Sequence, residues 1–169
     1  MREICAHAGT SINMVHHYFG SKQGLLDAIV DQFSSGVFAL PMLILDKEPR
    51  SKVEFMSMLE LLFDSTLDAF IEHRAVMMVV VREQADPEAL PTYMEHVGAF
   101  LERAKEKGFV RDDVDTDMIT GFLLDRMLNQ VQFAPWIQRN YGTDLLSDPE
   151  YRQRWSRSNV DVFLNGIVP

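Results

Sequence analysis

The chain has 169 residues, 47% of them hydrophobic and 24% charged, a balance that is typical of a globular protein and excludes a disordered one. No apolar run approaches the ~20 residues that span a bilayer, and the N-terminus lacks a signal-peptide pattern, so we expect a cytoplasmic protein. The formal charge of −9 argues against broad affinity for nucleic acid, and the single cysteine excludes an intrachain disulfide and a cysteine-rich zinc site.

Residues 2–33 are predicted to form two short helices around a tight turn, followed by a third helix. The turn lies at residues 8–11, where Gly9 permits a positive φ and where Ser11 or Thr10 can cap the next helix. Apolar residues share one face on each side of the turn: Ile4, Cys5 and Ala8 before it, and Val15, Tyr18 and Phe19 after it. This spacing is typical of a helix-turn-helix, whose second helix enters the major groove of DNA. We expect Cys5 to be a small buried side chain rather than a redox sensor.

The rest of the chain carries the start and stop signals of further helices. Ser51 and Glu54 form a capping box, Asp86 and Pro87 suit a helix cap and first helical position, and Asp115 caps another helix. The predicted helices cover residues 22–35, 51–72, 74–84, 86–107 and 115–138, and the last one starts at residues 147–150. Because no segment alternates convincingly with period two, the predicted fold class is all-α.

Apolar residues mark the inner faces of these helices. The third helix, which Ser21 caps and which Gly36 and Pro41 weaken or end, carries Leu25, Leu26, Ile29 and Phe33 on its stripe. The helix over 51–72 carries Val53, Met56, Leu59, Phe63, Thr66, Leu67 and Phe70. The helix over 115–138 has apolar residues on more than one face: Met118, Ile119, Phe122, Leu123, Met127, Leu128, Val131 and Ile137. Such a helix is covered on both sides, either by a large core of its own or by a second subunit.

At the helix-turn-helix the chain resembles the TetR family of bacterial transcriptional regulators. The matching residues are Ile4, Ala8, Gly9, Ser11, Tyr18, Phe19, Ser21, Lys22 and Leu25. Cys5, Thr10 and His16 depart from the family pattern, with Cys5 at a position that is usually alanine and Thr10 at one that is usually valine.

The resemblance implies a domain organisation. Family members have a further first helix, often preceded by a basic arm, whereas this chain begins at Met1, just inside the second helix of the pattern. We therefore expect residues 1–35 to form a helix-turn-helix domain that lacks its first helix, together with a connecting helix. Residues 36–169 are expected to form a helical ligand-binding and dimerisation domain, which pairs with a second copy through its last two long helices. Asn129, Gln130 and Gln132 are expected at the margin of that interface.

Two sets of residues are candidates for contact with operator DNA. The start of the second helix would present Ser11, Ile12, Asn13 and Met14 to base edges. Phosphate contacts, which set register rather than sequence, are predicted for His16, His17, Tyr18 and Lys22, although Tyr18 and Phe19 also suit a small core. Residues 1–33 hold two basic against three acidic residues, which leaves 14 basic and 22 acidic residues for the remainder. This weak local charge argues against DNA binding by the chain alone.

The resemblance also implies a small-molecule effector in a cavity of the larger domain. Large flexible or aromatic side chains are the predicted walls, each with ordinary core packing as the alternative: Phe63, Phe70, Met77, Met78, Tyr93, Met94, Phe100, Phe122 and Met127. We expect no metal, because His16 and His17 are adjacent on a helix and diverge by about 100°. No cofactor motif and no catalytic constellation is found, so an enzyme is not expected.

The leading hypothesis is a homodimeric, ligand-responsive regulator, with repression favoured over activation, that an apolar or amphipathic effector releases from its operator. The alternative is a dimeric helical small-molecule-binding protein that does not bind DNA in this form.

Overall fold

The structure, a computed structural model, describes residues 1–34, 36–83, 85 and 89–169. All regular secondary structure in these residues is helical, as predicted. The helices are α1 (Arg2–His7), α2 (Ile12–Phe19), α3 (Lys22–Ser34), α4 (Ala39–Leu45), α5 (Lys52–Glu72), α6 (Arg74–Glu83), α7 (Ala89–Glu106), α8 (Thr116–Tyr141) and α9 (Pro149–Ile167).

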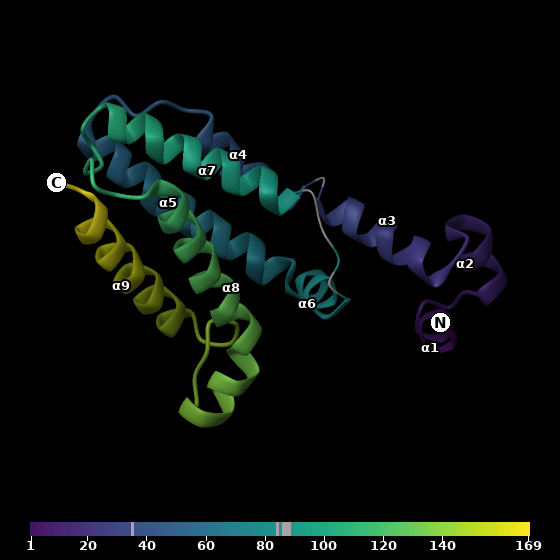
Figure 1. Ribbon diagram of the computed structural model, residues 1–169. Helices are drawn as coiled ribbons and strands as arrows, with labels where there is room; N and C mark the ends of the chain where they lie inside the picture. Colours follow the sequence, from purple (N-terminus) through teal and green to yellow (C-terminus); the bar gives the residue numbers. More distant parts are fainter. Residues whose placement is uncertain (35, 84, 86–88) are drawn as a thin grey trace.

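The molecule is elongated, with α1 and α2 at one end and α4–α9 forming a larger body (Figure 1). Helix α3 connects the two parts and packs against α2 at one end and α6 at the other. Phe33, near the end of α3, belongs to the core of the body, where its ring makes an edge contact with His73 at a centroid distance of 5.7 Å. The position of α3 therefore links the small N-terminal unit to the packing of the body.

The core of the body is built around α5, which packs against α4, α6, α8 and α9. Phe38 stacks on Tyr93 of α7 with ring centroids 4.1 Å apart. The Tyr93 hydroxyl lies 2.5 Å from Thr66 Oγ1 on α5. Burial raises the pKa of the Tyr93 hydroxyl, and its hydrogen bond with Thr66 acts in the opposite direction.

Several features of the apolar pattern differ from the sequence prediction. Ile29, predicted on the inner stripe of α3, is 37% exposed, and Val30 is buried in its place. Val53 is 73% exposed, whereas Phe55 is fully buried and stacks near Phe100 at 5.6 Å, so the inner stripe of α5 starts at Phe55. A short helix, α4, also follows α3 where the sequence predicts an ending. Pro41 is tolerated there because it lies in the first turn, where the backbone N–H groups have no helical partner.

The predicted helix caps are confirmed where the structure describes them. Ser51 Oγ accepts from the Glu54 amide at 3.2 Å, but the Glu54 carboxylate accepts from the amide of Arg50, at 2.8 Å, rather than from that of Ser51. Asp115 caps α8. Asp148 caps α9, and hydrogen bonds, first that from Thr143, lower its pKa. The predicted start at Asp86 and Pro87 lies outside the described residues.

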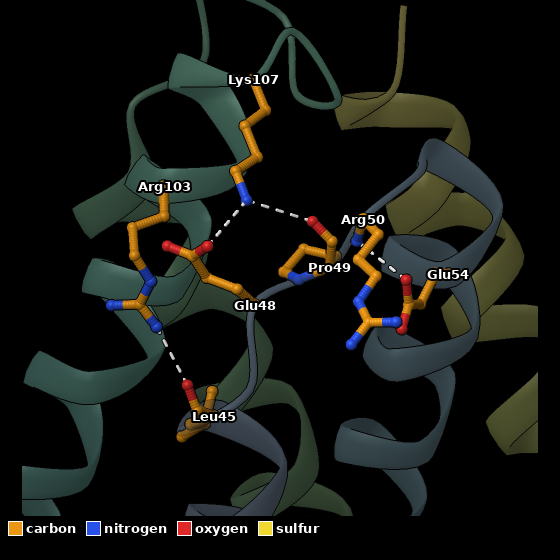
Figure 2. A network of polar contacts seen from close by, with 7 residues as sticks. All are labelled: Leu45, Glu48, Pro49, Arg50, Glu54, Arg103 and Lys107. Carbon is orange, nitrogen blue, oxygen red and sulfur yellow. Dashed lines mark hydrogen bonds and ion pairs between the residues drawn. The ribbon is translucent and has the colours of Figure 1, made fainter.

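Polar contacts fasten the segment between α4 and α5 to the end of α7 (Figure 2). The Arg103 guanidinium donates to the carbonyl of Leu45 at 2.9 Å. The Lys107 ammonium donates to the Glu48 carboxylate at 3.1 Å and to the Pro49 carbonyl at 3.2 Å. Two of these contacts satisfy backbone carbonyls, that of Leu45 at the last residue of α4 and that of Pro49 in the segment after it. They thus hold α4 against α7.

None of the helices that the structure describes is both long and apolar enough to cross a membrane.

Candidate nucleic-acid interface

The turn between α1 and α2 has the geometry that its sequence predicts. Gly9 adopts a φ of +62°, a conformation that a β-carbon would disfavour. The amide of Thr10 donates to the Cys5 carbonyl at 2.9 Å and so closes the end of α1. Of the two candidate caps, Ser11 takes the role, since its Oγ accepts from the amide of Met14 at 3.2 Å. The start of α2 is therefore fixed by its own turn.

The junction between α2 and α3 is equally constrained. Gly20 ends α2 with a φ of +72°, and Ser21 Oγ caps α3 by accepting from the Gly24 amide at 2.9 Å. A β-carbon on Gly24 would lie 2.0 Å from the carbonyl oxygen of Phe19. The first turn of α3 thus abuts the backbone end of α2, an approach that only glycine permits. Sequence reasoning missed Gly24, although a glycine inside a helical pattern signals such a close approach.

The side chains predicted to read bases gather at the start of α2. Ser11, Asn13 and Met14 are exposed, and Ile12 is half-buried. Val15 of α2 is buried together with Cys5 of α1, as predicted for Cys5. One face of α2 therefore packs on α1 while the other presents polar and apolar groups to solvent.

The side chains predicted to contact phosphates lie at the other end of α2 and the start of α3. His16, His17, Tyr18 and Lys22 are all exposed. His16 Nδ1 lies 2.9 Å from the Gly20 carbonyl, so Nδ1 carries the proton and Nε2 faces away. The alternative role of Tyr18 and Phe19 in a small core is not seen in the described chain, because they are 69% and 39% exposed. Contact of these eight residues with DNA stays a prediction.

The nine predicted walls of the effector cavity occupy different environments. Six are buried in the core of the body: Phe63, Phe70, Met77, Tyr93, Phe100 and Met127. Met78 is half-buried, Met94 is 37% exposed, and Phe122 is 58% exposed on the surface of α8. The structure thus does not bring all nine together.

Two hollows are found elsewhere on the body. One, of about 960 Å³, lies between α5 and α9. The other, of about 610 Å³, lies beside the C-terminal half of α8. In the part of the chain that the structure describes, none of the nine predicted walls lines either hollow. An effector site at those nine residues stays a prediction.

Comparison with known proteins relates the chain to bacterial regulators. Residues 1–29 match the family model of bacterial regulatory proteins, tetR family. The chain is 26% identical over 133 residues to the HTH-type transcriptional regulator UidR of Escherichia coli K12, covering 74% of this chain and 65% of UidR. It is 26% identical over 136 residues to the HTH-type transcriptional repressor KstR2 of Mycobacterium tuberculosis H37Rv, covering 74% of this chain and 66% of KstR2. The chain thus spans just under two thirds of the length of these relatives.

The fold is shared with solved structures. The ketosteroid transcriptional regulator KstR2 of Mycobacterium tuberculosis superposes with a TM-score of 0.69 at 21% identity. A protein of unknown function from Rhodococcus sp. RHA1 superposes with a TM-score of 0.71 at 15% identity. Each match covers 99% of this chain and 84% of the solved one. Residues 1–29 are thus similar to the tetR family of bacterial regulatory proteins, and the relatives of the chain named above are regulators. The described chain as a whole shares the fold of the KstR2 structure.

Proposed function

We propose that this protein is a DNA-binding transcriptional regulator, a repressor that a small apolar or amphipathic effector releases from its operator. The observation that carries the proposal is the N-terminal unit, in which α2 is fixed by caps on both sides and turns its open face to solvent at one end of the molecule (Figure 1). In a helix-turn-helix this helix reads the major groove. The regulators UidR and KstR2 among its relatives support the same role.

In this proposal residues 1–35 read DNA and residues 36–169 bind the effector and a second subunit. Exposed apolar side chains on α8 and α9 support the dimer: Met118, Phe122, Phe133 and Trp136 on α8, and Val162 on α9. Their spacing along α8 places the four α8 residues on one face. A second copy that covers this face would place two reading helices with two-fold symmetry, as operators with half-sites about 34–36 Å apart require.

The effector acts in this proposal by favouring a conformation in which the two reading helices no longer fit the operator. A ligand that bound both conformations equally would change nothing. Support for such coupling comes from α3, whose Phe33 packs in the core of the body and contacts His73. A shift of α6 would therefore move α3 and, with it, the reading helix.

A mobility-shift experiment with the full gene product and the DNA upstream of its gene tests the proposal. We expect retention that falls steeply with salt. Lys22→Ala should weaken retention of all sequences and reduce the salt slope by about one, whereas Asn13→Ala should cost about 1–3 kcal/mol on the operator alone. Lys47→Ala, an exposed lysine of the body, serves as the control. Absence of retention at low salt contradicts the proposal.

The weak charge of the N-terminal unit favours a second candidate function. With two basic against three acidic residues in positions 1–33, the unit adds little to phosphate binding. The chain would then be a dimeric helical protein that binds a small molecule without reading DNA. Ligand-induced thermal stabilisation together with no retention of any DNA, in the full gene product, is the result that this second function predicts.

A further inference from the structure

Helix α8 contains a proline, and the backbone carbonyl that this proline leaves without its helical donor is bound by another helix. Proline has no N–H, so Pro135 cannot donate the hydrogen bond that the Val131 carbonyl accepts in a regular helix. The guanidinium Nε of Arg74, the first residue of α6, donates to that carbonyl at 3.1 Å. Arg74 therefore replaces the missing helical donor.

The Val131 carbonyl depends on this contact because water does not reach it. Val131 is 0% exposed, whereas Pro135 lies on the surface of the same helix. A buried carbonyl without a donor is unfavourable, and a hydrogen bond from a charged donor such as a guanidinium is stronger than one between neutral groups. Arg74 takes part in none of the ion pairs found among the described residues. Its charged group is thus used to bind α8.

The same corner of the chain also holds the connecting helix. His73 comes directly before Arg74 at the junction of α5 and α6, and its ring contacts Phe33 near the end of α3. Helix α6 packs against both α3 and α8 and lies between them in Figure 1. Two adjacent residues therefore join α3 to α8, His73 through a ring contact and Arg74 through a hydrogen bond.

We propose that Arg74 is a positioning residue, which fixes the orientation of α3 relative to α8 by supplying the donor that Pro135 lacks. The consequence for operator binding rests on the proposed regulatory function, whereas the positioning of α3 does not. Phe133 and Trp136, next to Pro135 in α8, belong to the exposed face at which a second copy is proposed to pack. In such a dimer Arg74 holds each N-terminal unit at a fixed orientation to the subunit interface.

The positioning role differs from a stabilising role alone, and the two separate when Pro135 is replaced. Pro135→Ala returns an N–H to α8, so the Val131 carbonyl regains a helical donor. It does not restore the link between α6 and α8 once Arg74 has been substituted. In the double variant, Arg74→Met with Pro135→Ala, the carbonyl is therefore satisfied while α6 is released from α8.

Urea denaturation of the full gene product tests the replacement of the donor. Arg74→Met, which keeps a long flexible side chain and removes the donor, should raise the unfolding equilibrium constant about 10–150-fold, the range for a hydrogen bond to a charged group. In the Pro135→Ala background the same substitution should raise it about twofold or less. Arg82→Met is the control near the other end of α6, where the Arg82 side chain is 85% exposed. Equal losses in the two backgrounds would overturn the proposal.

Amide hydrogen exchange tests the positioning of α3 without DNA. In the double variant, exchange in α3 should be several-fold faster than in Pro135→Ala alone, although the two have similar global stability, because release of α6 makes local opening of α3 easier. Exchange in α3 equal to that of Pro135→Ala would leave Arg74 with a stabilising role only and would overturn the proposal.

Mobility-shift measurements then separate the positioning role from the regulatory function. The double variant should retain operator DNA about 2–30-fold more weakly than Pro135→Ala, the range for substitutions that alter coupling between distant sites, and Arg82→Met should match the unchanged protein. No retention by the unchanged protein, with the difference in α3 exchange preserved, overturns the regulatory function and supports the positioning role. Retention by the double variant equal to that of Pro135→Ala overturns the consequence of the positioning role for operator binding.

Discussion

The N-terminal unit and the helical body are held together by different kinds of interaction. In α1, α2 and the turn between them, Cys5 and Val15 are the buried side chains that the structure describes, and the geometry depends on caps and glycines. In the body, the single helix α5 buries large apolar side chains along its length, and it packs against four other helices. The difference teaches that backbone geometry fixes the structure of the N-terminal unit, whereas the packing of large side chains fixes the structure of the body. It predicts different sensitivities to substitution in the two regions.

The largest expected effect is on the body. Phe55 is fully buried, so Phe55→Ala should lower the free energy of unfolding by about 3–5 kcal/mol, measured by urea denaturation. Val53→Ala is the matched control on the same helix, because Val53 is 73% exposed and its truncation should stay within about 0.5 kcal/mol. Similar losses for the two variants would contradict the inner stripe of α5 described above.

A smaller but more local effect is expected in the N-terminal unit. Gly24→Ala forces a β-carbon against the Phe19 carbonyl, so α3 must move away from α2 at a penalty of about 1–3 kcal/mol. Faster amide hydrogen exchange confined to α2 is the expected observation, with loss of DNA retention. Gly121→Ala is the control, since nothing lies within 4 Å of its added β-carbon and alanine favours helix by about 1 kcal/mol. Protection of α2 equal to that of the unchanged protein would show that the close approach does not fix the unit.

The smallest expected effect is on a buried hydrogen bond in the core of the body. Tyr93→Phe removes the hydrogen bond to Thr66, which keeps its bond to the Leu62 carbonyl at 2.6 Å, and should lower stability by about 0.5–1.5 kcal/mol. Burial raises the pKa of Tyr93 in the folded protein. Ionisation of Tyr93 therefore leaves the free energy of unfolding unchanged below the pKa of an unfolded tyrosine, about 10. Above that pH the unfolded state ionises first, so the free energy of unfolding falls as the pH rises.

The measurement is the urea midpoint between pH 9 and 11.5. It should fall less steeply in Tyr93→Phe than in the unchanged protein, whereas Tyr141→Phe, at a 69% exposed site, should follow the unchanged protein. Identical slopes for all three would mean that Tyr93 does not titrate with a raised pKa.

Much of the local structure was predictable because it is encoded within a few residues. Ser11, Ser51, Asp115 and Asp148 cap their helices through amides two or three positions ahead, and such bonds need no distant partner. Periodicity also predicted an all-helical chain. The prediction that Val53 lies on the inner face of α5 was wrong. A helical pattern shows which residues share a face, but it does not show which face the neighbouring helices cover.

The candidate sites were less predictable. Exposure of Asn13 and Lys22 follows from the motif, but Phe122 was grouped with core residues that it does not join. The hollow beside the C-terminal half of α8 escaped prediction because Tyr151 comes from α9 and the other lining residues from α8, and their meeting depends on how the two helices pack.

The sequence by itself determined the caps of Ser11, Ser51 and Asp115, the helices that they start and the turn at Gly9, since each depends on hydrogen bonds and φ values within a few residues. The tertiary structure alone decided that Arg74 reaches the carbonyl released by Pro135 and that Phe33 rests on His73. These contacts join residues far apart in the chain, so they exist only once side-chain volumes have fixed how α3, α6 and α8 pack.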